Sequence, residues 1–288
     1  MRGEKKVFQP NLLEGKRILI TGGGTGLGRA MADRFLQLGA AVYICGRRAG
    51  VLQQTCAELA ASTSGEISSF VCDVRDRDAV EQMIAKIWES GPLHVLVNNA
   101  AGNFIARSEE LSPRAWEAVL GIVLHGTLNV TLACGRRWLE SGQHATVLNI
   151  STTYAAVGSG SAYVVPSAVA KAGVLALTRS LAVEWGPRGI RLNAIAPGPI
   201  RTEGAFSRLL PRNDLEQHAL GRIPLRRFAT REEFANLAAF LVSDGCTHVN
   251  GEVVVMDGGE WLQGAGEFGY VGQLLTDSDW QGLRPKKR

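Results

Sequence analysis

The chain has 288 residues, of which 45% are hydrophobic and 20% charged, as in an ordinary globular protein with a large core. Its net charge of +4 is modest, and the terminal PKKR is interpreted as a solvated tail, so no nucleic-acid partner is expected. Five cysteines without CxxC spacing exclude a disulfide framework and a zinc site, and no metal is expected. Without an apolar run of about 20 residues or a signal core, we expect a cytoplasmic protein without membrane insertion.

Strand and helix patterns alternate along the chain. The first strand, 17–21, leads through a glycine-rich loop into a helix that ends near Leu38. Further strands are expected at 41–45, 67–72, 93–100, 146–151, 190–196 and 252–256. The helices between them are expected to end near residue 61 and to span 76–90, 113–138, the segment up to Trp185 and 231–242.

This alternation predicts an α/β fold, a Rossmann-type doubly wound parallel sheet with helices on both faces. No composition shift marks a second domain, so residues 1–288 are expected to form a single domain. Residues 202–225 form a polar excursion that contains proline and arginine, and the tail from about residue 262 is irregular.

The glycine loop, TGGGTGLG at 21–28, lies between a strand and a helix. Glycines there allow a tight turn, and the free N–H groups of a helix N-terminus bind the pyrophosphate of a dinucleotide. Gly22, Gly26 and Gly28 give the spacing GxxxGxG instead of GxGxxG. In this context the loop predicts a dinucleotide cofactor.

Arginines follow the second strand, where a dinucleotide's adenosine ribose usually lies. An acidic residue there would favour NAD, whereas the guanidinium groups of Arg47 and Arg48 suit the 2′-phosphate of NADP(H). Alternatively, both arginines are solvated at the start of a helix. Asp73, which ends the third strand, is interpreted as an acceptor for the adenine amino group, a helix N-cap, or both.

The stretch from Ser151 to Gly173 holds the candidate chemistry. Lys171 lies in a helical pattern, but the residue one turn before it is Ser167 and not a tyrosine. The tyrosines of this stretch are Tyr154 and Tyr163.

TGGGTGLG (21–28), NNAAG (98–102), the lysine-bearing helix and PGPI (197–200) together resemble the short-chain dehydrogenase/reductase family. Standard members carry Tyr-x-x-x-Lys, in which the lysine binds the nicotinamide ribose and lowers the pKa of the tyrosine. Here that motif reads Ser167-Ala-Val-Ala-Lys171, and residues 122–126 lack the asparagine usual in the preceding long helix.

With both departures, the chain resembles the mitochondrial-type 2,4-dienoyl-CoA reductases. The resemblance rests on NNAAGNF (98–104), IVLHGT (122–127), TTYA (152–155), VVPSAVAKAG (164–173), PGPIRTEGAFSR (197–208), GRIPLRR (221–227) and NLAAFLVSD (236–244). It implies that Asn103 and Tyr154 are the catalytic pair, with Ser167 and Lys171 completing the site. On the residues alone, Asn103 is alternatively a turn residue and Tyr154 a core tyrosine with a satisfied hydroxyl.

The same resemblance implies the ligand contacts. NADP(H) is expected to contact Gly22, Gly24, Thr25, Gly26, Leu27, Arg47, Arg48, Asp73, Val74, Asn99, Lys171, Pro197, Gly198 and Ile200. A fatty acyl-CoA thioester is expected to contact Arg47, Arg75, Phe104, Ser112, Tyr163 and Arg208, the last in a lid at about 202–225.

Two of these substrate residues have open alternatives. Arg75 follows Asp73 and is alternatively a solvated side chain. Tyr163 lies in a loop, 158–167, that is two residues longer than the family's GSGFVVPS. We interpret Tyr163 as a wall of the acyl pocket, with a second hydroxyl near the substrate as the alternative.

The function implied is NADPH-dependent reduction of a 2,4-dienoyl-CoA to a 3-enoyl-CoA in unsaturated fatty-acid β-oxidation. Two alternatives are a reductase of 3-oxoacyl or 2-enoyl thioesters and a non-catalytic NADP-binding sensor or scaffold. The family also implies a homotetramer built on the helices 113–138 and 167–185. The lack of targeting signals is what a bacterial cytoplasmic homologue would show.

Overall fold

The computed structural model describes residues 8–156, 160–202, 213–265, 276 and 278. Within these residues seven strands form one parallel sheet in the order β3-β2-β1-β4-β5-β6-β7. The strands are β1 (Arg17–Thr21), β2 (Ala41–Gly46), β3 (Ile67–Val71), β4 (Val95–Asn98), β5 (Ala145–Ile150), β6 (Ile190–Pro197) and β7 (Val253–Met256). The predicted α/β class and single Rossmann-type domain are therefore confirmed.

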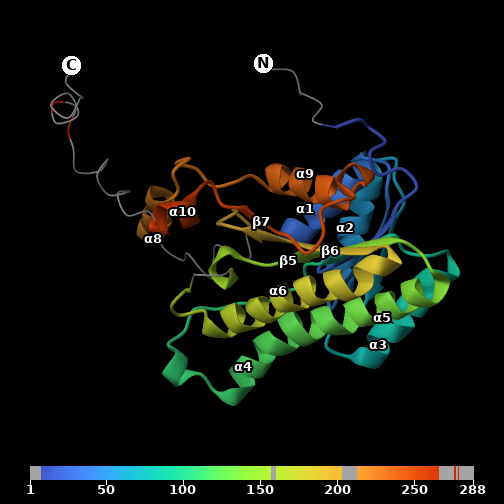
Figure 1. Ribbon diagram of the computed structural model, residues 1–288, viewed down its shortest axis with the longest axis horizontal. Helices are drawn as coiled ribbons and strands as arrows, with labels where there is room; N and C mark the ends of the chain where they lie inside the picture. The colour runs from blue at the N-terminus through green and yellow to red at the C-terminus, as the bar shows by residue number, and fades with distance from the viewer. Residues whose placement is uncertain (1–7, 157–159, 203–212, 266–275, 277, 279–288) are drawn as a thin grey trace.

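Helices cover both faces of the sheet, as Figure 1 shows. One face carries α1 (Gly26–Gln37), α2 (Ala49–Ser62) and α9 (Arg231–Val242). The other carries α3 (Arg77–Glu89), α5 (Gly126–Ser141) and α6 (Val165–Trp185). Each face has its own buried apolar cluster, centred on Phe35 and Phe234 on the first face and on Trp138 and Trp185 on the second.

Local chemistry sets several helix ends. The Asp76 carboxylate accepts hydrogen bonds from the backbone N–H groups of Asp78 and Ala79, which caps α3. Thr230 and Glu233 form a reciprocal capping box at the start of α9. Gly142 ends α5 in the left-handed conformation, with φ 67°.

The helix expected at 113–138 is longer than predicted and is not regular. It consists of α4 (Pro113–Leu120), a π-helical turn η2 (Gly121–His125) and α5. Gly126 packs closely against Val74 in the loop after β3. A Cβ at this position would lie 2.5 Å from Cγ2 of Val74, so the contact requires glycine. By length and composition Pro113–Ser141 could cross a membrane, yet 56% of its most apolar window is buried, as in core helices of globular proteins.

Other boundaries differ in smaller ways. The strand expected at 93–100 pairs only over β4, because Asn99 and Ala100 turn away to face the glycine loop. The excursion at 202–225 contains α8 (Asn213–Arg222), and residues 203–212 lie outside the described part of the chain. The segment expected to be irregular from about residue 262 begins inside α10 (Glu260–Ala265).

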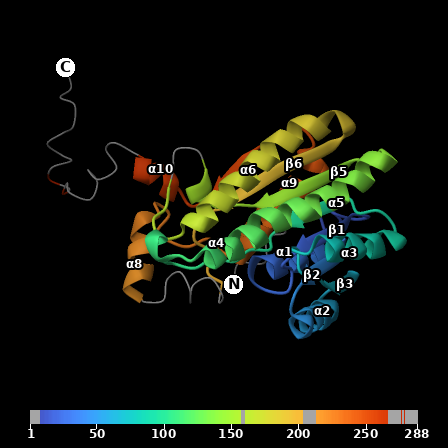
Figure 2. The same cartoon turned by 90° about the horizontal axis from the view of Figure 1, so that it is seen from below.

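Short helical turns complete the chain: η1 (Ser108–Glu110), η3 (Thr153–Ala155), η4 (Gly186–Arg188) and η5 (Asp244–Cys246). Figure 2 shows α4, α8 and α10 gathered at one end of the molecule, while α5 and α6 run side by side. The carboxyl ends of the strands meet the loops at this end, which is where ligands bind in doubly wound folds.

Candidate active site

A large cleft of about 2110 Å³ lies at the carboxyl ends of β1, β4, β5 and β6. It spans the point where the sheet order reverses between β1 and β4, the usual ligand site of this architecture. Pockets for one drug-sized ligand measure roughly 300–1,000 Å³, so this cleft has room for a dinucleotide and a second ligand. Every residue expected to contact NADP(H) lines it.

The glycine loop forms the floor of the cofactor end. Gly22 has φ 65°, and its N–H donates to the Cys45 carbonyl at 2.8 Å. A Cβ on Gly28 would lie 2.4 Å from the Gly22 carbonyl oxygen, so only glycine allows this close approach of loop and helix. The cradle leads directly into the N-terminus of α1 and fits a pyrophosphate.

Arg47 and Arg48 line the cleft where β2 ends, beside Asp73. The Asp73 carboxylate accepts hydrogen bonds from the Arg75 guanidinium, and their closest contact is 2.5 Å. That hydrogen bond is the main cause of the lowered pKa of Asp73, and the charges of Arg75 and Arg47 add to it. Asp73 is therefore an ionised acceptor at this end of the cleft, while α3 takes Asp76 as its N-cap.

The two cysteines that line the cleft, Cys45 and Cys72, are not activated. All five cysteines are free thiols, and burial raises the pKa of Cys45. Burial, followed by the negative charge of Asp73, raises the pKa of Cys72 to about 11. The thiol is therefore neutral near pH 7 and is not an activated nucleophile.

A buried polar chain that the sequence did not reveal lies beneath the site. The Asn98 amide donates to Thr131 at 2.8 Å and to Asn149 at 2.9 Å, and Asn149 donates to Thr178 at 2.8 Å. These bonds tie β4 and β5 to α5 and α6. The neighbouring Asn99 donates to the carbonyls of Thr21 and Gly22, which fixes the glycine loop. In the sequence, this hydrogen-bonded chain could have been inferred from Asn98 and Asn149, which lie inside two otherwise apolar strands.

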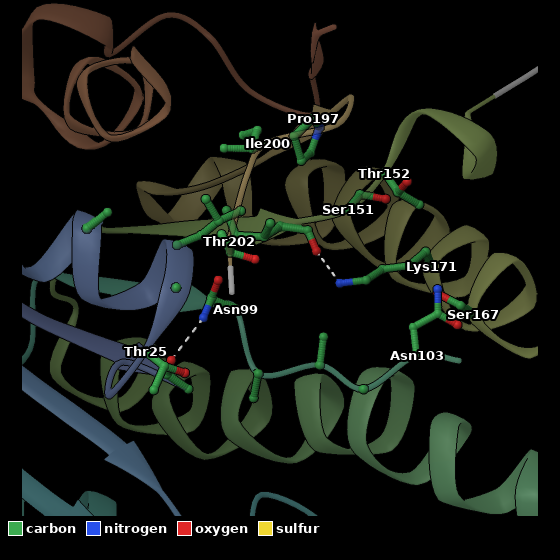
Figure 3. A pocket seen from close by; sticks show the side chains of 18 of the residues that line it. Thr25, Asn99, Asn103, Ser151, Thr152, Ser167, Lys171, Pro197, Ile200 and Thr202 are labelled. Atoms are coloured by element: carbon green, nitrogen blue, oxygen red, sulfur yellow. Dashed lines mark hydrogen bonds between the residues drawn. The ribbon is translucent and has the colours of Figure 1, made fainter. Parts of the chain in front are cut away.

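Lys171 reaches into the centre of the cleft from α6. Its side chain is buried, and its ammonium donates to the carbonyl of Ile150 at the end of β5. Burial lowers the pKa of Lys171 to about 8. Figure 3 shows Asn99 and Thr25 on one side of this side chain and Ser167 and Asn103 on the other.

Three polar side chains meet on the side of Lys171 away from the glycine loop. The Asn103 amide donates to the Tyr154 hydroxyl oxygen at 3.2 Å, and the Tyr154 hydroxyl lies 3.0 Å from the Ser167 hydroxyl. Asn103 lies in the loop after β4, Tyr154 in η3 and Ser167 in the first turns of α6. The three elements thus place an amide donor and a phenol donor together in the cleft.

Two further groups at the centre were not singled out in the sequence. The Ser151 hydroxyl is buried, lines the cleft and has no hydrogen-bond partner among the described residues, so it is available to a ligand. Thr202 lines the cleft where Gly26 opens α1, 3.7 Å from the position of a Cβ on that glycine. The sequence signal for them was their position next to motifs: Ser151 precedes TTYA, and Thr202 follows PGPI closely.

The residues expected to bind substrate are placed unevenly. Arg47 and Tyr163 line the cleft. Arg75, Phe104 and Ser112 do not: Arg75 is paired with Asp73, Phe104 packs on the cluster formed by Val119, Val123 and Ala170, and the Ser112 hydroxyl caps α4. Arg208 lies outside the described residues.

The arrangement suits a reduction in which negative charge develops on an oxygen. Two neutral donors converge on one spot, and a lysine separates them from a dinucleotide cradle. Such donors stabilise an oxyanion without having to transfer a proton. The tyrosine–lysine pair that exchanges a proton with a ketone is replaced here by Ser167 and Lys171.

Known proteins resemble this chain over most of its length. Residues 22–260 match the family model described as enoyl-(acyl carrier protein) reductase. A protein of Bacillus subtilis named probable 2,4-dienoyl-CoA reductase [(2E)-enoyl-CoA-producing] is 45% identical over 253 residues, covering 87% of this chain and 98% of that protein. Caenorhabditis elegans probable 2,4-dienoyl-CoA reductase 3 [(3E)-enoyl-CoA-producing] is 44% identical over 258 residues, covering 88% of this chain and 83% of that protein.

A solved structure is similar as well. The crystal structure of a short-chain dehydrogenase from Bacillus anthracis superposes with a TM-score of 0.77 at 42% identity, covering 85% of this chain and 96% of that chain. The names of the two relatives differ in the position of the product double bond, which depends on the carbon that receives the proton.

Proposed function

The chain belongs to the short-chain dehydrogenase/reductase family, and on that premise we propose that it reduces 2,4-dienoyl-CoA thioesters to 3-enoyl-CoA with NADPH. The observation that carries the proposal is the hydrogen-bonded set Asn103, Tyr154 and Ser167 at the centre of the cleft. It provides donors for an oxyanion at the place where a ketone reductase would carry a proton-transferring tyrosine.

NADPH, when bound, supplies a hydride to Cδ of the diene. The electrons of the Cγ=Cδ bond then form Cβ=Cγ, those of Cα=Cβ form a bond to the thioester carbon, and the negative charge rests on the thioester oxygen. The Asn103 amide and the Tyr154 hydroxyl donate to that oxygen and stabilise the dienolate. Protonation at Cα by water gives the 3-enoyl thioester and completes the reaction.

The remaining residues hold these groups in place. Ser167 contacts the Tyr154 hydroxyl and keeps the phenol directed at the oxyanion position. Lys171, whose ammonium donates to the Ile150 carbonyl, would bind the nicotinamide ribose. The Ser151 hydroxyl, which has no hydrogen-bond partner among the described residues, would be available to the same part of the cofactor.

The preference for NADP(H) rests on the arginines at the end of β2. Arg47 and Arg48 line the cofactor end of the cleft, and a 2′-phosphate would form charge-assisted hydrogen bonds with their guanidinium groups. No acidic side chain follows β2 at these two positions to take a ribose 2′-hydroxyl.

A homotetramer built on α4/α5 and α6 is part of the proposal. Val169 and Val183 on α6 are 49% and 79% exposed, which is the kind of surface that a subunit interface would cover. Light scattering after size exclusion should therefore give about four times the monomer mass of 30.9 kDa. A monomer peak would contradict this part.

The substrate assay separates the proposed reaction from its alternatives. The wild-type protein is supplied with NADPH and, in parallel, with 2,4-hexadienoyl-CoA, crotonyl-CoA or acetoacetyl-CoA, and NADPH absorbance is followed. We expect rapid oxidation with the diene and little with the other two. Turnover of the ketone or of crotonyl-CoA without the diene would overturn the proposal, and cofactor binding without any turnover would favour a sensor.

A further inference from the structure

Two segments leave the reaction centre in the same direction and meet again at its outer side. Along α6, Ser167 precedes Lys171 by one turn, about 6 Å along the axis, and Tyr163 comes before the helix begins. After β4 the chain passes from Asn99 at the glycine loop to Asn103 and then to Ile105. The Ala106 N–H donates to the Tyr163 carbonyl at 2.9 Å, which joins the two segments.

Tyr163 is held in an uncommon conformation at this junction. Its φ of 67° places a non-glycine residue in the left-handed region, at a cost of roughly 1–2 kcal/mol. The side chain nevertheless lines the cleft while 58% of its surface is exposed, and Ile105 lines the cleft with 48% exposed. We call Tyr163 and Ile105 the outer mouth.

The reaction fixes which part of the substrate passes this point. The thioester oxygen is placed at Asn103 and Tyr154, whereas Cδ has to approach the cofactor side, where Lys171 and Asn99 lie (Figure 3). The acyl chain therefore extends from the oxygen toward the cofactor, and the sulfur lies on the opposite side. Tyr163 comes before Ser167 at the end of α6 away from Lys171, so the outer mouth lies on that opposite side.

We propose that Tyr163 and Ile105 form the contact surface for the pantetheine arm of the CoA thioester, so that Tyr163 favours thioesters that carry this arm over simple alkyl thioesters. This inference rests on the proposed function and replaces the interpretation of Tyr163 as an acyl-pocket wall. The arm is a flexible chain of methylene groups and amides, which suits an aromatic ring and an aliphatic side chain that are both open to solvent.

The test compares two thioesters of the same acid. 2,4-Hexadienoyl-CoA carries the whole arm, and the S-ethyl thioester of 2,4-hexadienoic acid ends before its first amide. Tyr163→Asn removes the ring, and asparagine tolerates the left-handed conformation. Tyr163→Phe keeps the ring. Ile105→Asn removes the aliphatic side of the outer mouth at a position where φ is not positive. Phe240→Asn, at a half-exposed aromatic on α9 away from the cleft, is the matched control.

For 2,4-hexadienoyl-CoA we expect Tyr163→Asn and Ile105→Asn each to raise KM about 5- to 20-fold with little change in kcat, because the contact is remote from the reacting atoms. For the S-ethyl thioester, kcat/KM should change less than about two-fold. Tyr163→Phe should lose less than Tyr163→Asn, and Phe240→Asn should match the wild type. Equal losses on both thioesters, or no loss on either, would overturn the inference.

A binding measurement keeps this inference separate from the reaction. Calorimetric titration of butyryl-CoA into NADP⁺-saturated protein should show the same 5- to 20-fold weakening in Tyr163→Asn and Ile105→Asn. If the wild type does not reduce the diene but shows this weakening, the proposed function fails and the pantetheine contact stands. Unchanged affinity in folded variants, checked by thermal unfolding, would contradict the contact.

Discussion

At the scale of single residues, the Tyr154 hydroxyl takes part in two hydrogen bonds, one with Asn103 and one with Ser167. Tyr154→Phe removes a donor to the developing oxyanion and leaves the cofactor cradle intact. We expect kcat for 2,4-hexadienoyl-CoA to fall about 10²–10³-fold, and Asn103→Ala to act similarly.

The control for both variants is the dissociation constant of NADPH, measured by fluorescence, which should stay within about two-fold of the wild type. Near-wild-type kcat in Tyr154→Phe would remove this residue from the reaction.

Lys171 makes the stability of the ligand-free protein depend on pH in a direction that can be worked out. Burial lowers its pKa in the folded state to about 8, below the usual lysine value of 10.5. Below about pH 8 the lysine is charged in both states and the folded state bears the full burial cost. Above about pH 10.5 both are neutral and the cost is gone, so this contribution to stability rises with pH between those values.

Lys171→Met should therefore be more stable than the wild type below pH 8, by on the order of 3 kcal/mol. This advantage should shrink as the pH rises through 8 toward 10.5. Urea unfolding of both proteins at several pH values measures the difference between their unfolding free energies. Groups other than Lys171 titrate in both proteins, so their contributions cancel in this difference. An advantage that grows with pH would contradict the buried, destabilised charge.

How much of the site could be predicted differs from residue to residue. Asn103, Tyr154, Ser167 and Lys171 were predicted because they belong to continuous motifs, and the structure brings them together. The pairing of Arg75 with Asp73 and the cap at Ser112 depend on local backbone geometry, which the motifs do not encode. That the Ser151 hydroxyl has no partner in the described part of the chain depends on the folded positions of its neighbours, which the sequence does not give.

At the scale of elements, the contact between α5 and α6 requires a small residue at one point. A Cβ on Gly135 would lie 2.3 Å from Cη2 of Trp185, a rigid buried ring. Gly135→Ala should therefore destabilise the protein by about 1–3 kcal/mol despite the better helix propensity of alanine.

Gly50 in α2 is the matched control, because a Cβ there meets nothing within 4 Å. Gly50→Ala should be neutral or stabilising by up to about 1 kcal/mol. The midpoints and slopes of urea unfolding curves give the change in unfolding free energy for each of the two variants. Equal effects of the two substitutions would mean that α5 and α6 are not packed as described.

The elements were predicted well because strand and helix periodicity is a local property of the chain. The π-helical turn η2 was not predicted, since the sequence 121–125 is apolar and contains nothing that distinguishes it from regular helix. The turn lies where Gly121 and Gly126 face Arg75 and Val74, a tertiary contact that the local sequence does not encode. The helices α8 and α10 were not predicted either, and they contact each other across about 40 residues of chain.

At the scale of the whole molecule, the cofactor should stabilise the fold by binding only its folded form. At about 100 times its Kd, NADPH adds about 2.7 kcal/mol, and NADH at the same concentration should add less because it lacks the 2′-phosphate. Thermal unfolding with each cofactor measures this. Arg47→Ala combined with Arg48→Ala should remove most of the difference between the cofactors, and an unchanged difference would show that the arginines are only solvated.

The order of the strands and the two apolar clusters follow from the whole pattern of the sequence. Alternating strands and helices, joined by right-handed crossovers, leave few ways to form a parallel sheet, and the glycine loop marks where it reverses. This is why the fold was predictable. Tyr163 was expected in the cleft, but its contact with the segment that carries Ile105 depends on tertiary structure and was not predicted.

The most direct test of the central claim follows the hydride itself. The wild-type protein is given NADPH carrying deuterium at the transferred position together with 2,4-hexadienoyl-CoA in ordinary water, and the product is examined by NMR and mass spectrometry. We predict one deuterium at Cδ, a proton from water at Cα and a double bond between Cβ and Cγ. Deuterium at Cβ or at the carbonyl carbon would contradict a reaction in which Asn103 and Tyr154 stabilise a dienolate.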